Sequence, residues 1–158
     1  LTFQTAVLTE PVRVSGAPIA DIFAKIGGSD VDFVVKLIDV YPPEVAREPK
    51  MGGYQLPISL DIFRGRYRDS FSNPSPIPSG VTQRYKFRLP TVNHVFQPGH
   101  RIMVQIQSSL FPLYDRNPQT FVPNIFFAKR SDYVKATQRV FHADDTASFI
   151  ELPEVDAK

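Results

Sequence analysis

Apolar and polar residues alternate over short stretches of this chain, and prolines and glycines separate the stretches. The clearest alternation covers residues 84–89, and a similar one follows the Pro98-Gly99 turn at residues 101–108. A period of two is typical of a β-strand that buries one face. The side chains that we expect to be buried are Tyr85, Phe87, Leu89, Ile102, Val104 and Ile106. Those that we expect to be exposed are Arg84, Lys86 and Arg88.

Other stretches also have the composition of strands. They lie at residues 12–14, 19–26, 31–40, 60–68, 138–142 and 148–152. Residues 41–59 form a connection rich in proline and glycine, and no stretch has a convincing helical period. About eight short strands with long connections predict an all-β fold. We expect a two-sheet antiparallel β-sandwich of the jelly-roll, galactose-binding-domain-like type, formed by a single domain over residues 1–158.

Composition narrows the function without naming it. The 158 residues carry a formal charge of only +2, which gives no support to a nucleic-acid partner. The chain has no cysteine, so disulfides and cysteine-based zinc sites are excluded. No apolar stretch approaches the roughly 18 residues of a membrane span. We therefore expect no nucleic-acid or membrane partner and no cofactor.

The residues that could carry catalysis are few. No G-x-S-x-G elbow is present, and acyl transfer by serine needs a positioned nucleophile, base and acid. The spacing of His94, His100 and His142 fits no common zinc pattern, so each is expected to be structural or exposed. We predict neither catalytic residues nor metal ligands in this chain.

Two carboxylates bracket Val31 where a strand begins. Asp30 is interpreted as a turn cap, and Asp32 as a buried carboxylate that an arginine neutralises. Arg101 and Arg116 are the expected partners of Asp32. The structural polar candidates are Asp30, Asp32, His100 and Arg101.

Arg64, Arg66 and Arg68 alternate with apolar or small residues, which would place three guanidinium groups on one strand face. This stripe is either a docking or anion-binding surface, or a solvated face that Asp61 and Asp69 partly neutralise.

The connection at residues 109–131 is unusually apolar for a loop. It either folds over one end of the sandwich or packs on another domain, and both can hold. The candidate docking residues are Leu110, Phe111, Tyr114, Arg116, Asn117, Phe121, Arg64 and Arg66.

Several stretches, taken in order, resemble one family. They are residues 30–33 with 36–42, residues 64–68, residues 98–102, and residues 108–112 with 115–117. This order is similar to the C-terminal domain of the X-Pro dipeptidyl-peptidase, cocaine esterase (CocE/NonD) and α-amino-acid ester hydrolase group. Residues 51–56 and 116–125 most resemble the α-amino-acid ester hydrolases and the cephalosporin (glutaryl) acylases.

The resemblance implies a C-terminal jelly roll from a larger serine hydrolase, with an α/β-hydrolase domain that carries the Ser-His-Asp triad. The jelly roll would pack on that catalytic domain of the same polypeptide and help wall its active-site cleft. A periplasmic or secreted location, and self-association of the isolated chain through the exposed loop, are further expectations. The alternatives are a carbohydrate-binding jelly-roll module, against which the absence of tryptophan counts, and a stand-alone protein-interaction domain.

Overall fold

The computed structural model describes residues 1–156, and nearly all of its regular structure is β-strand. The strands are β1 (Thr2–Gln4), β2 (Val12–Gly16), β3 (Ile19–Ile26), β4 (Asp32–Val40), β5 (Gln55–Arg64), β6 (Thr82–Arg88), β7 (Val92–Phe96), β8 (Arg101–Gln107), β9 (Gln138–Val140) and β10 (Phe149–Glu151). Short 3₁₀ helices lie at Pro49–Met51, Gly65–Tyr67, Ile125–Phe127, Arg130–Asp132 and Asp144–Thr146. Within the described residues, no helix is long and apolar enough to span a membrane.

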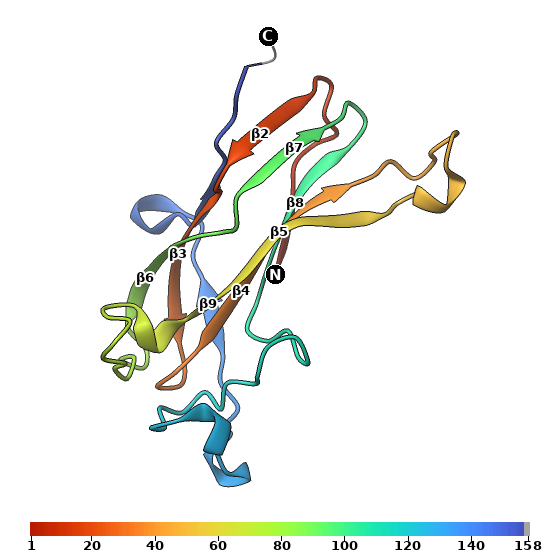
Figure 1. Cartoon of the computed structure of the whole chain (residues 1–158). Coiled ribbons are helices and arrows are strands. Elements are labelled where there is room, and N and C mark those ends of the chain that lie inside the picture. Colours follow the sequence, from red (N-terminus) through yellow and green to blue (C-terminus); the bar gives the residue numbers. More distant parts are fainter. Residues whose placement is uncertain (157–158) are drawn as a thin grey trace.

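The strands form two antiparallel layers (Figure 1). The first sheet has the order β1-β8-β4-β5. In the second layer, β3 lies between β6 on one side and β9 with β10 on the other. The β2–β7 ladder continues the β3–β6 ladder after a break, since β2 leads directly into β3 and β6 into β7. The predicted two-sheet antiparallel sandwich is confirmed, with ten short strands in place of about eight.

Alternate residues of the inner strands fill the space between the layers. One cluster includes Ala20, Ile22, Phe33, Val35 and Tyr85, and the buried members of a second are Val14, Leu37, Val92 and Phe96. A strand directs every second side chain to one face, so each cluster draws alternate positions from several strands.

The predicted buried face is confirmed for residues 84–89, but in β8 Met103, which lies on the other face, is more buried than Ile102 and Val104. Tyr85, Leu89 and Ile106 are buried, whereas Arg84, Lys86 and Arg88 are exposed. Phe87, Ile102 and Val104 are only half-buried. Ile102 and Val104 border an apolar groove at one edge of the sandwich, which leaves part of each side chain accessible.

The predicted strand at residues 60–68 was wrong at both ends, because β5 begins at Gln55 and ends at Arg64. Pro57 is tolerated because β5 is an edge strand, where a missing N–H costs no ladder bond, and the β4–β5 register shifts beside it. Gly65 then ends the strand. Its N–H donates to the Val31 carbonyl at 2.8 Å, and a Cβ at Gly65 would lie 2.7 Å from the Ile77 side chain.

Candidate docking surface

The connection between β8 and β9 carries four of the eight exposed aromatic side chains of the described residues, and it extends from the lower end of the sandwich in Figure 1. Its exposed large apolar side chains are Phe111, Leu113, Phe126, Phe127, Tyr133 and Val134. Phe111, Phe126 and Tyr133 line a shallow depression of about 650 Å³ together with Asp115, Arg116, Ile125 and Arg130. We call these seven residues the aromatic depression. Patches of this kind on soluble proteins mark interaction sites.

The docking candidates predicted from the sequence are distributed between this surface and the layer beneath it. Phe111 is 59% exposed, and the Arg116 guanidinium lies over its ring, 4.5 Å from the centroid. Leu110 and Tyr114 are half-buried and close a turn through the Tyr114 N–H and the Leu110 carbonyl. Phe121 is half-buried, so it contributes less accessible surface than Phe111.

Asn117 is buried and pins the base of the connection. Its side-chain N–H donates to Asp32 Oδ1 at 2.9 Å, and its Oδ1 accepts from the Gln119 N–H at 2.8 Å. Gln119 adopts a left-handed conformation with φ of 65°, and its carbonyl accepts from the Ser29 N–H. A Cβ at Gly28 would overlap the Gln119 carbonyl oxygen, so this close approach requires glycine.

Arg66 joins the end of β5 to the same connection. It is 4% exposed, and its Nε donates to Asp30 Oδ2 at 2.9 Å. Its Nη2 donates to the Val122 carbonyl at 2.7 Å, and its guanidinium lies 4.7 Å from the centre of the Phe121 ring. Asp30 is fully buried and accepts a second bond from the Val31 N–H at its other oxygen. Arg66 therefore anchors the β8–β9 connection through Val122 and Phe121. Because it is buried, it offers little surface to a docking partner.

Asp32 is buried as expected, but its predicted partners were wrong. Arg101 donates to the Thr5 carbonyl, and Arg116 lies over Phe111. The cation beside Asp32 is Arg64, whose Nη1 lies 3.6 Å from Asp32 Oδ2. Asp32 and Arg64 are directly opposite in the β4–β5 ladder, so their side chains share one face of the sheet.

The charge of Asp32 is incompletely compensated. The 3.6 Å separation is too long for a hydrogen bond, and among the described residues neither Asp32 Oδ2 nor Arg64 Nη1 makes one. Burial raises the pKa of Asp32 to about 6, and the bond from Asn117 and the charge of Arg64 offset this only in part. Arg64 Nη2 also lies 3.4 Å from Asp115 Oδ2, so Arg64 links the sheet to the aromatic depression.

The predicted arginine stripe was also wrong as a single strand face. Only Arg64 lies in β5, because the chain turns into a 3₁₀ helix at Gly65–Tyr67. Arg68 donates to the carbonyls of Ser75 and Pro76 and stabilises the following proline-rich loop. The turn therefore gives the three guanidinium groups three separate environments.

Asp39 is a buried polar residue that the sequence analysis did not single out. Its two oxygens contact His94 Nε2 at 2.9 Å and His100 Nδ1 at 2.7 Å. This places His100 in a structural pair, and the Tyr41 ring covers it at 4.4 Å between centroids. An aspartate inside a mostly apolar strand was the available signal, because a buried carboxylate requires partners. No group of three or more His, Cys, Asp or Glu side chains in the described part of the chain is placed to hold a metal ion.

A protein-family model of the X-Pro dipeptidyl-peptidase C-terminal non-catalytic domain matches residues 1–151. The chain belongs to this domain family. The cocaine esterase of Rhodococcus sp. (strain MB1 Bresler) is 36% identical to this C-terminal domain over 153 residues, which are 97% of this chain and 25% of the esterase.

Two solved structures extend the likeness. An α-amino acid ester hydrolase is 64% identical with a TM-score of 0.96, over 98% of this chain and 25% of its own. An aminopeptidase from a marine sediment archaeon (Thaumarchaeota archaeon) is 54% identical with the same TM-score, over 99% of this chain and 26% of its own. The chain thus spans about a quarter of the length of these relatives. The relatives are hydrolases, and in this family the matching part is non-catalytic and C-terminal.

Proposed function

We propose that this chain is the non-catalytic domain of a larger serine hydrolase that cleaves esters or amides. In that protein it packs on the catalytic α/β-hydrolase domain of the same polypeptide through the aromatic depression and helps wall the active-site cleft. The names of the relatives, an esterase, an ester hydrolase and an aminopeptidase, support ester or amide chemistry.

One observation carries the docking assignment: an aromatic surface is exposed on a loop whose base is rigidly bonded. Phe126 and Phe111 are 69% and 59% exposed, while Asn117 and Ile125 beneath them are at most 8% exposed. A loop that only covered its own sandwich would turn these rings inward. Aromatic side chains held in place by a fixed scaffold lose little entropy on binding, which is why they dominate interface energies.

The guanidinium groups at the depression add a second requirement on the partner. Arg116 and Arg130 line the same depression as Phe111, Phe126 and Tyr133. The Asp115 carboxylate there already forms an ion pair with Arg64. A partner surface with apolar groups and a carboxylate would therefore complement this site in shape and charge.

The test is made in the longer hydrolase with Phe111→Ser and Phe126→Ser combined. If the depression is the docking surface, thermal unfolding should separate into two transitions, and hydrogen exchange of residues 111–133 should accelerate. If the domain also walls the cleft, KM should rise at least as much as kcat falls.

Phe71→Ser is the matched control, because Phe71 is 85% exposed on the separate loop that follows Arg68. It should leave both the unfolding profile and the kinetics unchanged. A double variant that unfolds in one transition, with wild-type kinetics and exchange, would show that the domains meet elsewhere.

A further inference from the structure

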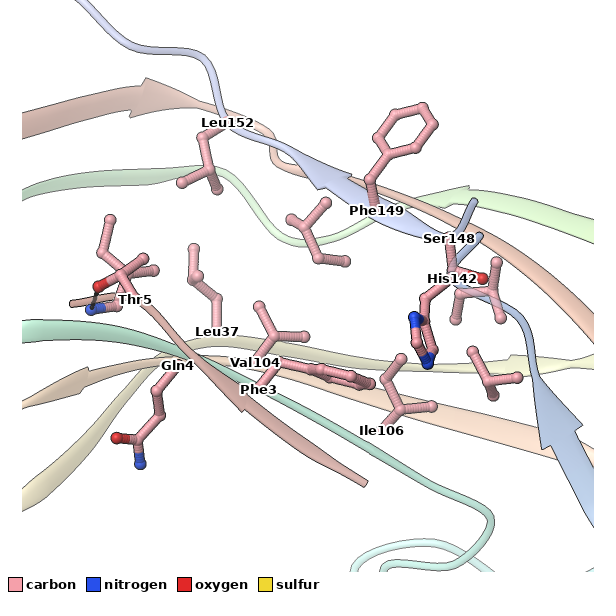
Figure 2. Close-up of a pocket in the computed structure, with 14 residues that line it drawn as sticks. Phe3, Gln4, Thr5, Leu37, Val104, Ile106, His142, Ser148, Phe149 and Leu152 are labelled. Atoms are coloured by element: carbon pink, nitrogen blue, oxygen red, sulfur yellow. Dashed lines mark hydrogen bonds between the residues drawn. The ribbon is translucent and has the colours of Figure 1, made fainter. Parts of the chain in front are cut away.

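A second apolar site lies along one edge of the sandwich. It is a groove of about 370 Å³ between β1 and β8 of the first sheet and β9 and β10 of the second. Its apolar lining includes Phe3, Val104, Ile106, Val140, Ile150 and Leu152. In Figure 2 the rings of Phe3 and His142 meet between the two layers, and their centroids are 6.4 Å apart.

The groove exists because the sandwich is open here. Phe3 remains 43% exposed, and Ile102 and Val104 of the inner sheet face are only half-buried. Side chains on the inner faces of a sandwich are normally buried by the facing sheet. Apolar inner-face residues with this much accessible surface indicate that a covering element belongs at this edge.

The edge strand β1 has backbone groups free to bind such an element. Leu1 and Ile106 exchange both backbone bonds, and the Thr5 N–H donates to the Ile102 carbonyl. Because backbone groups of a strand alternate in direction, the N–H and C=O groups of Thr2 and Gln4 face away from β8. Among the described residues, β1 pairs with β8 alone. This outer edge can therefore accept another strand.

Leu1 lies in the β1–β8 ladder, beside the groove. Its amino nitrogen donates to the Ile106 carbonyl at 2.8 Å, inside the β1–β8 ladder. A peptide N–H at this place would donate the same bond, so preceding polypeptide would leave from the rim of the groove. The matching family is a C-terminal domain, and about three quarters of each relative lies outside the matched region.

We propose that the polypeptide preceding Leu1 in the longer hydrolase forms a hairpin with β1 and closes this groove. Its strand runs antiparallel to β1, binds the free backbone groups of Thr2 and Gln4, and directs alternate apolar side chains against Phe3, Ile106 and Ile150. This rests on the proposed function in one respect, namely that the domain is part of a longer chain. Strand addition to an open edge supplies both backbone bonds and side-chain burial.

Residue-resolved hydrogen exchange tests the proposal on three forms. They are the 158-residue chain, the chain extended by the roughly 20 preceding residues that a strand and turn require, and the longer hydrolase. The Thr2 and Gln4 amides should exchange rapidly in the first form and at least about 100-fold more slowly in the other two, since ladder amides exchange only through opening.

Three results would overturn the proposal. One is rapid exchange of both amides in the longer hydrolase. Another is protection in the longer hydrolase but not in the extended chain, because a distant segment would then be the cover. The third is protection in the longer hydrolase that depends on its concentration, which would make a second copy the occupant. The longer hydrolase alone decides the first outcome, so the test survives if the shorter form folds poorly.

A variant pair gives an independent readout in the longer hydrolase. Phe3→Glu should lower the melting temperature of the domain by about 4 °C or more, because the charge would lie beneath the added strand. Phe71→Glu, the same change at a highly exposed phenylalanine outside the groove, should leave it unchanged. Equal effects would count against the hairpin. The Phe3 variant is measured independently of the Phe111 and Phe126 variants. The hairpin proposal and the docking proposal can therefore be refuted separately.

Discussion

Asp32 gives this domain a pH-dependent stability that asparagine at the same position should remove. Its carboxyl is 1% exposed, and burial raises its pKa from the ordinary 3.8 to about 6. An acid with a higher pKa in the folded state binds its proton more tightly there than in the unfolded chain. Its contribution to stability is therefore fully present below pH 4 and is lost as the pH rises through 6.

The magnitude follows from the two pKa values. A rise from 3.8 to about 6 corresponds to about 3 kcal/mol, because one pKa unit is equivalent to about 1.4 kcal/mol. Asparagine keeps the size of the side chain and an oxygen that can accept from Asn117, but it carries no charge at any pH. Between pH 4 and pH 7, the free energy of unfolding of the wild type should fall by about 2 kcal/mol relative to Asp32→Asn, because the carboxyl of the unfolded chain is already partly ionised at pH 4.

Urea unfolding followed by far-UV circular dichroism at pH 4, 5, 6 and 7 measures this difference. Groups that titrate equally in both proteins cancel, so the difference curve reports Asp32. Asp21→Asn is a control of opposite sign, because the hydrogen bond from Arg84 lowers the pKa of Asp21. The wild type should be more stable than Asp21→Asn at neutral pH, and its advantage should shrink only in acid.

A difference between wild type and Asp32→Asn that stays constant from pH 4 to pH 7 would refute this reasoning. It would mean that the Asp32 carboxylate is fully compensated, by a closer Arg64 or by solvent, and that its burial carries no electrostatic cost.

Three further predictions concern the buried Arg66–Asp30 ion pair, the catalytic inactivity of the isolated chain and the aromatic depression. Arg66→Ala should destabilise the domain by about 3–5 kcal/mol in chemical denaturation, because it leaves the buried Asp30 carboxylate without its cation; a loss below 1 kcal/mol would contradict this pairing. The isolated chain should not turn over activated esters or X-Pro anilides, and activity that a serine-directed covalent inhibitor abolishes would disprove this. The isolated chain should self-associate through the aromatic depression at high concentration, and Phe111→Ser should weaken that association in sedimentation velocity; unchanged sedimentation would exclude this surface.

The sequence alone was sufficient for the elements whose own residues specify them. The strand predicted at residues 19–26 has those bounds in the structure, and the 84–88 alternation gave the correct buried face. In both, the apolar period of two is a local property that any half-buried strand must satisfy. The β1 and β7 strands were missed because β1 has three residues and β7 follows Pro90 closely, so neither shows a local period.

The pairing of charges was decided only by the tertiary structure. Asp32 meets Arg64 because the β4–β5 register places them opposite each other, and Arg66 reaches Asp30 because a turn at Gly65 redirects the chain. Three arginines at alternate positions look equivalent in the sequence, and a single turn gives them different neighbours. The exposure of Phe111 and the buried position of Asn117 are likewise set by contacts between segments distant in sequence. Long-range electrostatic and packing partners depend on the register and turn positions of the whole sheet, and these are not encoded within either partner's own stretch of chain.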